Sequence, residues 1–166
     1  GNKAASTRYR FSQFFPYLEA NGFECKMYPL LDDKYLTNRF STGAISWKNV
    51  LQGYIKRFFV LLDPKMRASI AVVYSELFPF LPLWLERFLL KRPAAYVYDF
   101  DDAFYLSYTK NKIALVRLLF SGKISGLIKN AGYVCAGNRN LAEYARKYNN
   151  KIAIIPTVVD ARRYSV

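Results

Sequence analysis

The chain has 166 residues, of which 52% are hydrophobic and 17% aromatic. This is enough apolar side chain to build a core, and it excludes a disordered chain. Lysine and arginine outnumber aspartate and glutamate by 25 to 12, for a formal net charge of +13, which favours polyanionic partners: nucleic acid, an anionic membrane surface or phosphorylated small molecules. The absence of histidine excludes histidine acid–base catalysis and histidine metal ligands from this chain.

The first predicted element is a helix that follows an N-cap at Ser6–Thr7. Its apolar positions are Phe11, Phe14, Phe15 and Leu18. Pro16 falls inside this pattern and predicts a kink, and Gly22 predicts the end of the helix. The alternation over residues 23–30 then predicts a strand, and the sequence over 35–40 allows a short helix.

The next predicted helix begins after Ser46 and ends at Asp63–Pro64. Its predicted apolar face consists of Trp47, Val50, Leu51, Tyr54, Phe58, Leu61 and Leu62. Residues 70–74 follow as a short, almost wholly apolar strand, which is typical of strands buried in a parallel sheet. Another predicted helix contains Leu81, Trp84, Leu85, Phe88 and Leu89 and ends before Pro93.

Residues 94–103 run from an apolar and aromatic strand straight into three carboxylates, Asp99, Asp101 and Asp102. A long basic helical section over 111–129, broken near Ser121–Gly122, leads to a predicted strand at 133–136. A helix after Asn138 and a last strand at 151–155 complete the pattern. Short strands that alternate with helices predict βαβ units and a mostly parallel sheet, which is an α/β, three-layer Rossmann-like lobe.

Cys25 and Cys135 both lie in apolar, strand-like runs. A disulfide between them is geometrically allowed, but two buried reduced thiols of a cytosolic protein are the simpler interpretation. No apolar run approaches the roughly 20 residues that cross a bilayer, and the first residues lack the apolar region of a signal peptide. We therefore expect a cytoplasmic protein that can associate with the inner face of the membrane peripherally.

Several motifs occur in a characteristic order along the chain. They are Ala5-Ser6-Thr7-Arg8-Tyr9-Arg10, Pro16-Tyr17-Leu18-Glu19-Ala20-Asn21-Gly22-Phe23, Ser75-Glu76-Leu77 with Pro79, Tyr98-Asp99-Phe100-Asp101-Asp102-Ala103, Gly137-Asn138 with Leu141-Ala142-Glu143-Tyr144, and Ile154-Ile155-Pro156-Thr157-Val158-Val159-Asp160 with Arg163-Tyr164. This order resembles the N-terminal domain of a GT-B glycosyltransferase of the group-1 (family 4) type, over nearly the whole chain.

The resemblance implies a single Rossmann-like, acceptor-side domain over residues 1–166. The full enzyme would transfer a sugar from a nucleotide-sugar donor to a glycan or a lipid-linked acceptor, without a metal cofactor, in the synthesis of cell-envelope polysaccharides. Two departures accompany it. The first strand of the family should precede the Arg8 helix. The second lobe, which makes most of the contacts to the nucleotide-sugar in this family, should follow Val166. We therefore expect a fragment that is inactive alone and that lacks the first strand of its sheet.

The three aspartates are the first candidate site. Ligand sites of open α/β sheets lie at the carboxyl ends of the strands, where a carboxylate can act as base toward an acceptor hydroxyl. The resemblance places a His-Asp pair in many relatives where Asp101 and Asp102 stand here, and the histidine is missing. The Asp-x-Asp spacing is also similar to the metal motif of the GT-A fold, a weak signal that we set aside. The structural alternative is an acidic turn that caps the next helix or pairs with arginine.

Four further residues are candidates for substrate binding. Arg8 and Arg10 begin the first predicted helix, where anions such as acceptor phosphate or donor diphosphate are attracted. An ion pair with Asp101, Asp102 or Glu76 is the alternative for the arginines. Glu76 ends its strand and could bind acceptor hydroxyls, or could be a partner of Arg8. Asn138 is expected to act as an N-cap, with a ligand contact as the alternative.

Two basic sections could hold the protein on an anionic leaflet. The first has an aromatic face, Trp47, Tyr54, Phe58 and Phe59, flanked by Lys48, Lys56, Arg57, Lys65 and Arg67. The second contains Lys110, Lys112, Arg117, Lys123 and Lys129. The alternative for either section is a solvated charged face over an ordinary core helix, which is the more frequent case.

Three other classes of protein remain as alternatives. A nucleic-acid-binding domain fits the charge, but no helix-turn-helix, zinc or RNP-like motif supports specific binding. A non-catalytic interaction domain could keep the fold and lose the activity. A receiver-like doubly wound protein also carries aspartates at strand ends, although the Ile-Pro-Thr-Val-Val-Asp segment argues against it.

Overall fold

A computed structural model describes residues 7–33, 35, 37, 41, 43 and 46–159. The predicted N-cap at Ser6, most of the predicted helix over 35–40, and the motif residues Asp160, Arg163 and Tyr164 lie outside the described residues. The chain divides into two compact units, Gly1–Arg57 with Thr157–Val166 and Phe58–Pro156.

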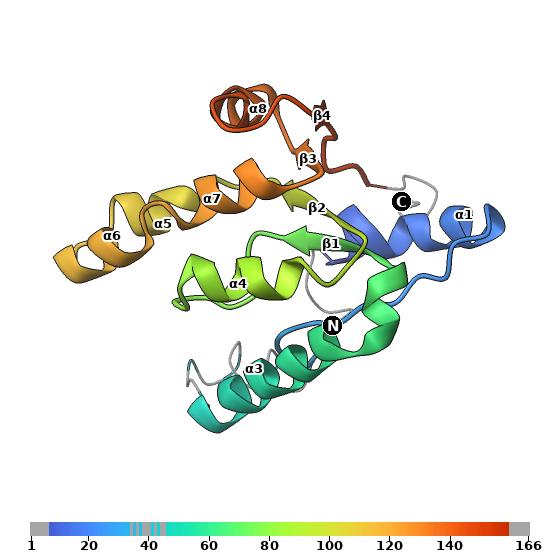
Figure 1. The fold of residues 1–166 in the computed structure, drawn as a ribbon, viewed down its shortest axis with the longest axis horizontal. Helices are drawn as coiled ribbons and strands as arrows, with labels where there is room; N and C mark the ends of the chain where they lie inside the picture. Colours follow the sequence, from blue (N-terminus) through green and yellow to red (C-terminus); the bar gives the residue numbers. More distant parts are fainter. Residues whose placement is uncertain are drawn as a thin grey trace. The chain divides into compact units, whose positions relative to one another are not determined.

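The first unit opens with three short helical segments in place of the one predicted helix. A π-helical turn, Thr7–Phe11, and a 3-10 turn, Ser12–Phe14, precede α1, Phe15–Ala20 (Figure 1). Pro16 has no N–H to donate and its ring excludes the carbonyl four residues back, so it occupies the first turn of a new helix rather than kinking a continuous one.

The end of α1 confirms the predicted role of Gly22. Its φ of +86° is the left-handed conformation that glycine adopts without strain. The N–H of Gly22 donates to the carbonyl of Glu19 at 3.0 Å, and the N–H of Phe23 donates to that of Leu18 at 3.1 Å. This pair of hydrogen bonds is the Schellman motif.

The strand predicted over residues 23–30 is wrong, because this segment is extended but pairs with no strand among the described residues. It lies along α3, Trp47–Leu62, instead. The Tyr28 carbonyl accepts a hydrogen bond of 2.9 Å from Arg57. A Cβ on Gly53 would collide with the Leu30 carbonyl, so α3 needs a glycine there. The alternating apolar and polar residues of 23–30 are therefore explained by packing against α3 rather than by pairing in a sheet.

Helix α3 begins and ends where the sequence predicts, directly after Ser46 and before Asp63. Asp63 caps the following 3-10 helix, Pro64–Ala68, by accepting a 2.9 Å hydrogen bond from the Lys65 N–H. The predicted apolar face of α3 is only partly covered: Leu61 is buried, whereas Trp47 and Leu51 are exposed.

The second unit is an α/β structure around four parallel strands in the order β1-β2-β3-β4 (Figure 1). Its elements are β1 Ile70–Tyr74, α4 Leu83–Leu90, β2 Ala95–Phe100, α5 Tyr105–Thr109, α6 Ala114–Phe120, α7 Lys123–Asn130, β3 Tyr133–Ala136, α8 Arg139–Arg146 and β4 Ile152–Ile154. The α/β class, the parallel sheet, these four strands and the break near Ser121–Gly122 are confirmed.

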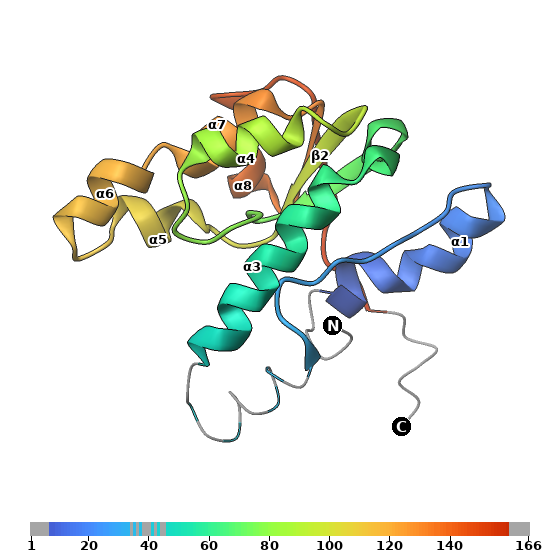
Figure 2. The same ribbon diagram turned by 60° about the horizontal axis from the view of Figure 1, so that its bottom comes forward.

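One face of this sheet is buried. Tyr98 is paired in register with Val73 and Val134, and these three side chains are at most 2% exposed. Every crossover moves one strand in the same direction, so right-handed connections place α4, α7 and α8 on one face; Figure 2 shows these helices on one side of β2.

The opposite face is less covered, since Ile70 and Val72 are 61% and 55% exposed. The predicted third layer, which would cover this face, stays a prediction. Among the described strands, β1 is an edge strand.

Candidate functional site at the carboxyl edge of the sheet

The loops that follow β1, β2 and β3 begin at one level of the sheet. The Ser75 N–H donates to the Asp99 carbonyl at 3.0 Å, and the Gly137 N–H donates to the Phe100 carbonyl at 2.8 Å. These bonds extend the parallel ladder by one residue past the strands. The candidate residues Glu76, Asp101 and Asn138 therefore all leave the sheet at its carboxyl edge, where ligand sites of parallel sheets lie.

The aspartates after β2 differ in their surroundings. Asp99 is buried at 6% exposure, opposite Tyr74 in the register of β1 and β2. Asp101 is partly exposed, and its Oδ1 accepts a 2.6 Å hydrogen bond from the Tyr74 hydroxyl. The Asp102 side chain is exposed, while its carbonyl accepts a 2.8 Å bond from the Phe104 N–H. The turn is thus fixed through its backbone and Tyr74, and it presents carboxylate to solvent.

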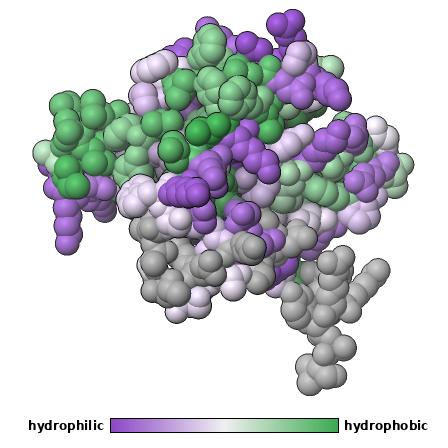
Figure 3. Space-filling model, turned by 90° about the horizontal axis from the view of Figure 1, so that it is seen from below, coloured by the Kyte–Doolittle hydropathy of each residue, from purple (hydrophilic) through white to green (hydrophobic). Residues whose placement is uncertain are grey.

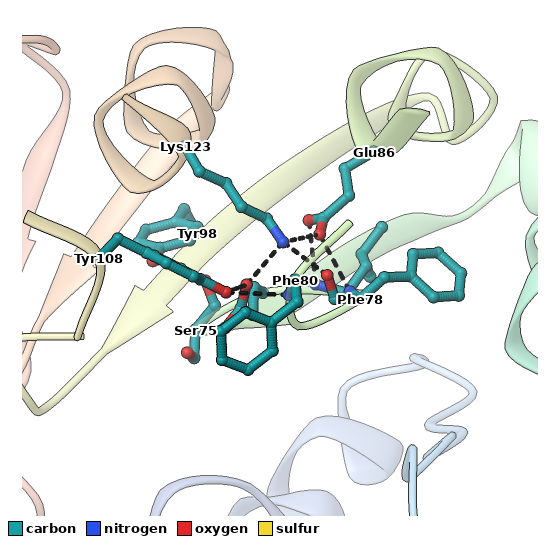
Figure 4. A network of polar contacts seen from close by, with 9 residues as sticks. Ser75, Phe78, Phe80, Glu86, Tyr98, Tyr108 and Lys123 are labelled. Atoms are coloured by element: carbon teal, nitrogen blue, oxygen red, sulfur yellow. Dashed lines mark hydrogen bonds and ion pairs between the residues drawn. The ribbon is translucent and has the colours of Figure 1, made fainter. Parts of the chain in front are cut away.

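Glu76 lies in a network that the sequence analysis did not predict. Figure 4 shows Lys123, Glu86 and Tyr108 of this network pointing toward one another. Its Oε2 is 2.6 Å from the Lys123 Nζ and accepts a 2.7 Å hydrogen bond from the Tyr108 hydroxyl. Only 14% of the Glu76 side chain is exposed. Lys123 of α7 is therefore an ion-pair partner of Glu76 within the second unit.

Glu86 of α4 completes this network. Its side chain and that of Lys123 are fully buried, with 2.9 Å between Oε1 and Nζ. Glu86 also accepts hydrogen bonds of 3.0 Å from the backbone N–H groups of Leu77 and Phe78. Lys123 donates to the Phe78 carbonyl at 2.5 Å. One ammonium group thus joins two carboxylates and the loop backbone, and the predicted surface position of Lys123 is wrong.

Burial dominates the electrostatics of this network. It raises the pKa of Glu86 above its usual range, although Lys123 and the two backbone N–H groups oppose the shift. Burial likewise raises the pKa of Tyr108, and the neighbouring Glu76 carboxylate raises it further, against the opposing Phe80 N–H. At neutral pH the Tyr108 hydroxyl keeps its proton and donates it to Glu76.

The loop held by this network carries backbone strain at both ends. Ser75 has φ of +62° and Phe80 has φ of +57°, the left-handed region that costs a non-glycine residue about 1 kcal/mol or more. Each is fixed by a tyrosine: Tyr98 donates to the Ser75 carbonyl at 2.7 Å, and the Phe80 N–H donates to the Tyr108 oxygen at 3.1 Å. The network thus fixes the conformation of the loop after β1.

Asn138 is the N-cap of α8, as expected. Its Oδ1 accepts a 3.0 Å hydrogen bond from the Leu141 N–H. This bond satisfies one of the unpaired N–H groups of the first helical turn.

Arg8 and Arg10 lie in the first unit, within the turn Thr7–Phe11. Arg10 is buried and its Nη1 donates to the Thr157 hydroxyl at 3.0 Å. Arg8 is exposed, and its guanidinium lies 5.5 Å from the centre of the Tyr9 ring. An ion pair of the arginines with Asp101, Asp102 or Glu76 stays a prediction, because the carboxylates belong to the other unit.

The residues missed by sequence reasoning are Glu86, Lys123, Tyr98 and Tyr108. Glu86 carried a usable signal, since it is the one acidic residue in the otherwise apolar and basic segment 80–92. A buried carboxylate requires a partner, but the sequence does not identify Lys123 as that partner.

Cys25 and Cys135 are reduced thiols, half-buried rather than buried.

Within the described part of the chain, no group of three or more Cys, Asp or Glu side chains is arranged to hold a metal ion. Among those same residues, no helix combines the length and the apolar character needed to cross a bilayer.

Comparisons with models of protein families, with curated proteins and with solved structures gave no match.

Proposed function

We propose that this chain is the acceptor-side domain of a GT-B-type glycosyltransferase, which transfers a sugar from a nucleotide-sugar to a hydroxyl of a glycan or a lipid-linked acceptor. One observation carries the proposal: an acidic turn at the carboxyl end of β2, in an all-parallel sheet, with its backbone hydrogen-bonded and Asp102 exposed. The order of motifs along the chain supports the same assignment.

In the proposed reaction, the acceptor oxygen forms a bond to the anomeric carbon of the donor sugar, and the bond from that carbon to the nucleotide diphosphate breaks. The proton of the acceptor hydroxyl passes to a carboxylate, for which Asp101 and Asp102 are the candidates. Tyr74 orients Asp101 through its 2.6 Å hydrogen bond. Asp99 is buried in β2, two residues before Asp101, and would support the acidic turn from inside the protein.

The remaining candidates have supporting roles in this proposal. Arg8 and Arg10 would contact phosphate groups of the substrates, since guanidinium binds phosphate through paired hydrogen bonds. Glu76, held by Lys123 and Tyr108, would fix the loop that borders the acidic turn. Asn138 would position the third loop by capping α8.

The test is sugar transfer by the polypeptide that the complete gene encodes. It would be incubated with a panel of nucleotide-sugars and with glycan or polyprenyl-linked acceptors. We expect Asp101→Asn or Asp102→Asn to lower the transfer rate about 100-fold or more, the range of a lost general base. The control is Glu143→Gln, which changes an exposed carboxylate of α8.

Two results would refute the proposal. One is the absence of transfer from every donor by a folded protein. The other is transfer at the same rate by both aspartate variants and the Glu143→Gln control.

A further inference from the structure

Helix α6 presents its apolar side chains to solvent. Leu115, Leu118 and Leu119 are 61%, 80% and 59% exposed, and Ile113, directly before the helix, is 61% exposed. Figure 3 shows apolar side chains gathered at the end of the molecule that α6 occupies, next to hydrophilic ones. No residue of α6 is buried.

The spacing of these leucines makes their exposure unusual. Residues at i, i+3 and i+4 share one face of a helix, and in a globular protein such an apolar face normally turns toward the core. In α6 the opposite side makes the inward contacts: Phe120 lies 5.6 Å from the Tyr108 ring and 6.3 Å from the Phe80 ring, centre to centre. Packing in the protein core therefore does not explain why these leucines share one face of α6.

The surroundings of this face are positively charged. Residues 103–142 contain six lysines and arginines and no acidic residue. Lys110 and Lys112 are exposed directly before α6. Arg117 donates to the Asn111 carbonyl at 2.6 Å and to the Lys112 carbonyl at 3.2 Å, so it holds the lysine-bearing turn against the helix.

We propose that the leucine face of α6 docks on the surface of an anionic phospholipid membrane. Leucines that enter the headgroup and acyl boundary, with lysines beside them at the level of the headgroups, are the features of an interfacial helix. A second copy of this chain is a poorer occupant, because a symmetric dimer would bring the same positive rim against itself. The proposal does not depend on sugar transfer, since membrane docking can occur without it.

The test measures binding of the purified chain to vesicles. The vesicles are phosphatidylcholine alone, or phosphatidylcholine with about one third phosphatidylglycerol. We expect binding to the anionic vesicles that weakens as salt rises. Leu118→Gln should lower the partition coefficient about tenfold without changing the circular dichroism spectrum. The matched control is Ile154→Gln, which changes a 43% exposed aliphatic side chain of β4, outside both basic sections, and which should bind like wild type.

A second variant separates the charge from the leucines. Lys110→Gln with Lys112→Gln should remove most of the preference for anionic over neutral vesicles. The proposal is overturned if wild type does not bind anionic vesicles, or if Leu118→Gln binds them as well as wild type. It is also overturned if Ile154→Gln loses as much binding, or if wild type is a dimer that Leu118→Gln converts to a monomer.

Discussion

Two carboxylates leave the same edge of the sheet from neighbouring strands, and each accepts a hydrogen bond from a tyrosine. Tyr108 donates to Glu76 at 2.7 Å, and Tyr74 donates to Asp101 at 2.6 Å. Their further surroundings differ. The Glu76 side chain is 14% exposed and is paired with Lys123, whereas Asp101 is partly exposed and is followed by the exposed Asp102.

This difference separates a carboxylate that serves the fold from carboxylates available to a ligand. The Lys123 network fixes a strained loop and joins α4, α7 and the end of β1, so both of its carboxylates have their partners inside the protein. The acidic turn after β2 has its backbone fixed, but Asp102 remains open to solvent. In the proposed function, a substrate hydroxyl would reach the second group without breaking a buried ion pair, whose disruption costs several kcal/mol.

The largest effect is expected for Lys123→Met. This change leaves the carboxylates of Glu76 and Glu86 without their buried cation, and such a loss destabilises a protein by about 3 to 5 kcal/mol. Urea denaturation measures the free energy of unfolding. The control is Lys112→Met, an exposed lysine, which we expect to change this free energy by less than about 0.5 kcal/mol. Equal stability of the two variants would contradict the network.

A smaller loss is expected for Tyr108→Phe. The Glu76 carboxylate and the Phe80 N–H each lose a partner, which costs about 1.5 to 3 kcal/mol when the acceptor is charged. The control is Tyr133→Phe, which changes an exposed tyrosine of β3 and should be nearly neutral. A loss for Tyr108→Phe no larger than for Tyr133→Phe would contradict the hydrogen bonds assigned to Tyr108.

The same variant gives a pH dependence. Folding raises the pKa of Tyr108 above about 10, the ordinary value of tyrosine. The stabilisation by its hydroxyl is therefore complete below pH about 10 and is lost as the pH rises above this value. The difference in unfolding free energy between wild type and Tyr108→Phe should be constant at neutral pH and shrink in alkali. A difference that grows in alkali would contradict the direction of the shift.

The smallest of these losses is expected for Tyr74→Phe. The hydrogen bond to Asp101 is partly exposed, so water can replace it, and we expect a cost of about 0.5 to 1.5 kcal/mol. If the proposed function holds, the transfer rate should also fall, because Asp101 loses its orientation. Expressed as a free energy, this fall should exceed the loss of unfolding free energy. A change in stability with an unchanged transfer rate would assign Tyr74 a structural role only.

The sequence was sufficient for elements whose pattern is local. The apolar run of 70–74 and the strand before the aspartates predicted two neighbours of the parallel sheet, and Gly22 and Asn138 predicted helix ends that depend on adjacent residues. The prediction of a strand over 23–30 was wrong, because alternating apolar and polar residues indicate that an extended segment has two different faces. The pattern does not indicate which element packs on the apolar face. Helix α3, with a glycine at position 53 to allow close approach, covers this segment in place of another strand.

The candidate site shows the same limit. The positions of Asp101 and Asp102 at a strand end follow from local pattern, whereas the partner of Glu76 does not. Lys123 lies 47 residues from Glu76 along the chain and resembles the exposed lysines around it in sequence. Only the packing of α7 against α4 removes its side chain from water and pairs it with Glu86. Long-range ion pairs of this kind are fixed by tertiary structure rather than by spacing.

The most direct test of this division is the unfolding free energy of the double variant Asp101→Asn with Asp102→Asn, measured beside Lys123→Met. We expect the double variant to lose less than about 1.5 kcal/mol of unfolding free energy, because asparagine can still accept the Tyr74 hydrogen bond. Lys123→Met should lose about 3 to 5 kcal/mol. A double variant that is as unstable as Lys123→Met would show that the acidic turn also serves the fold, and would contradict the division between the two groups.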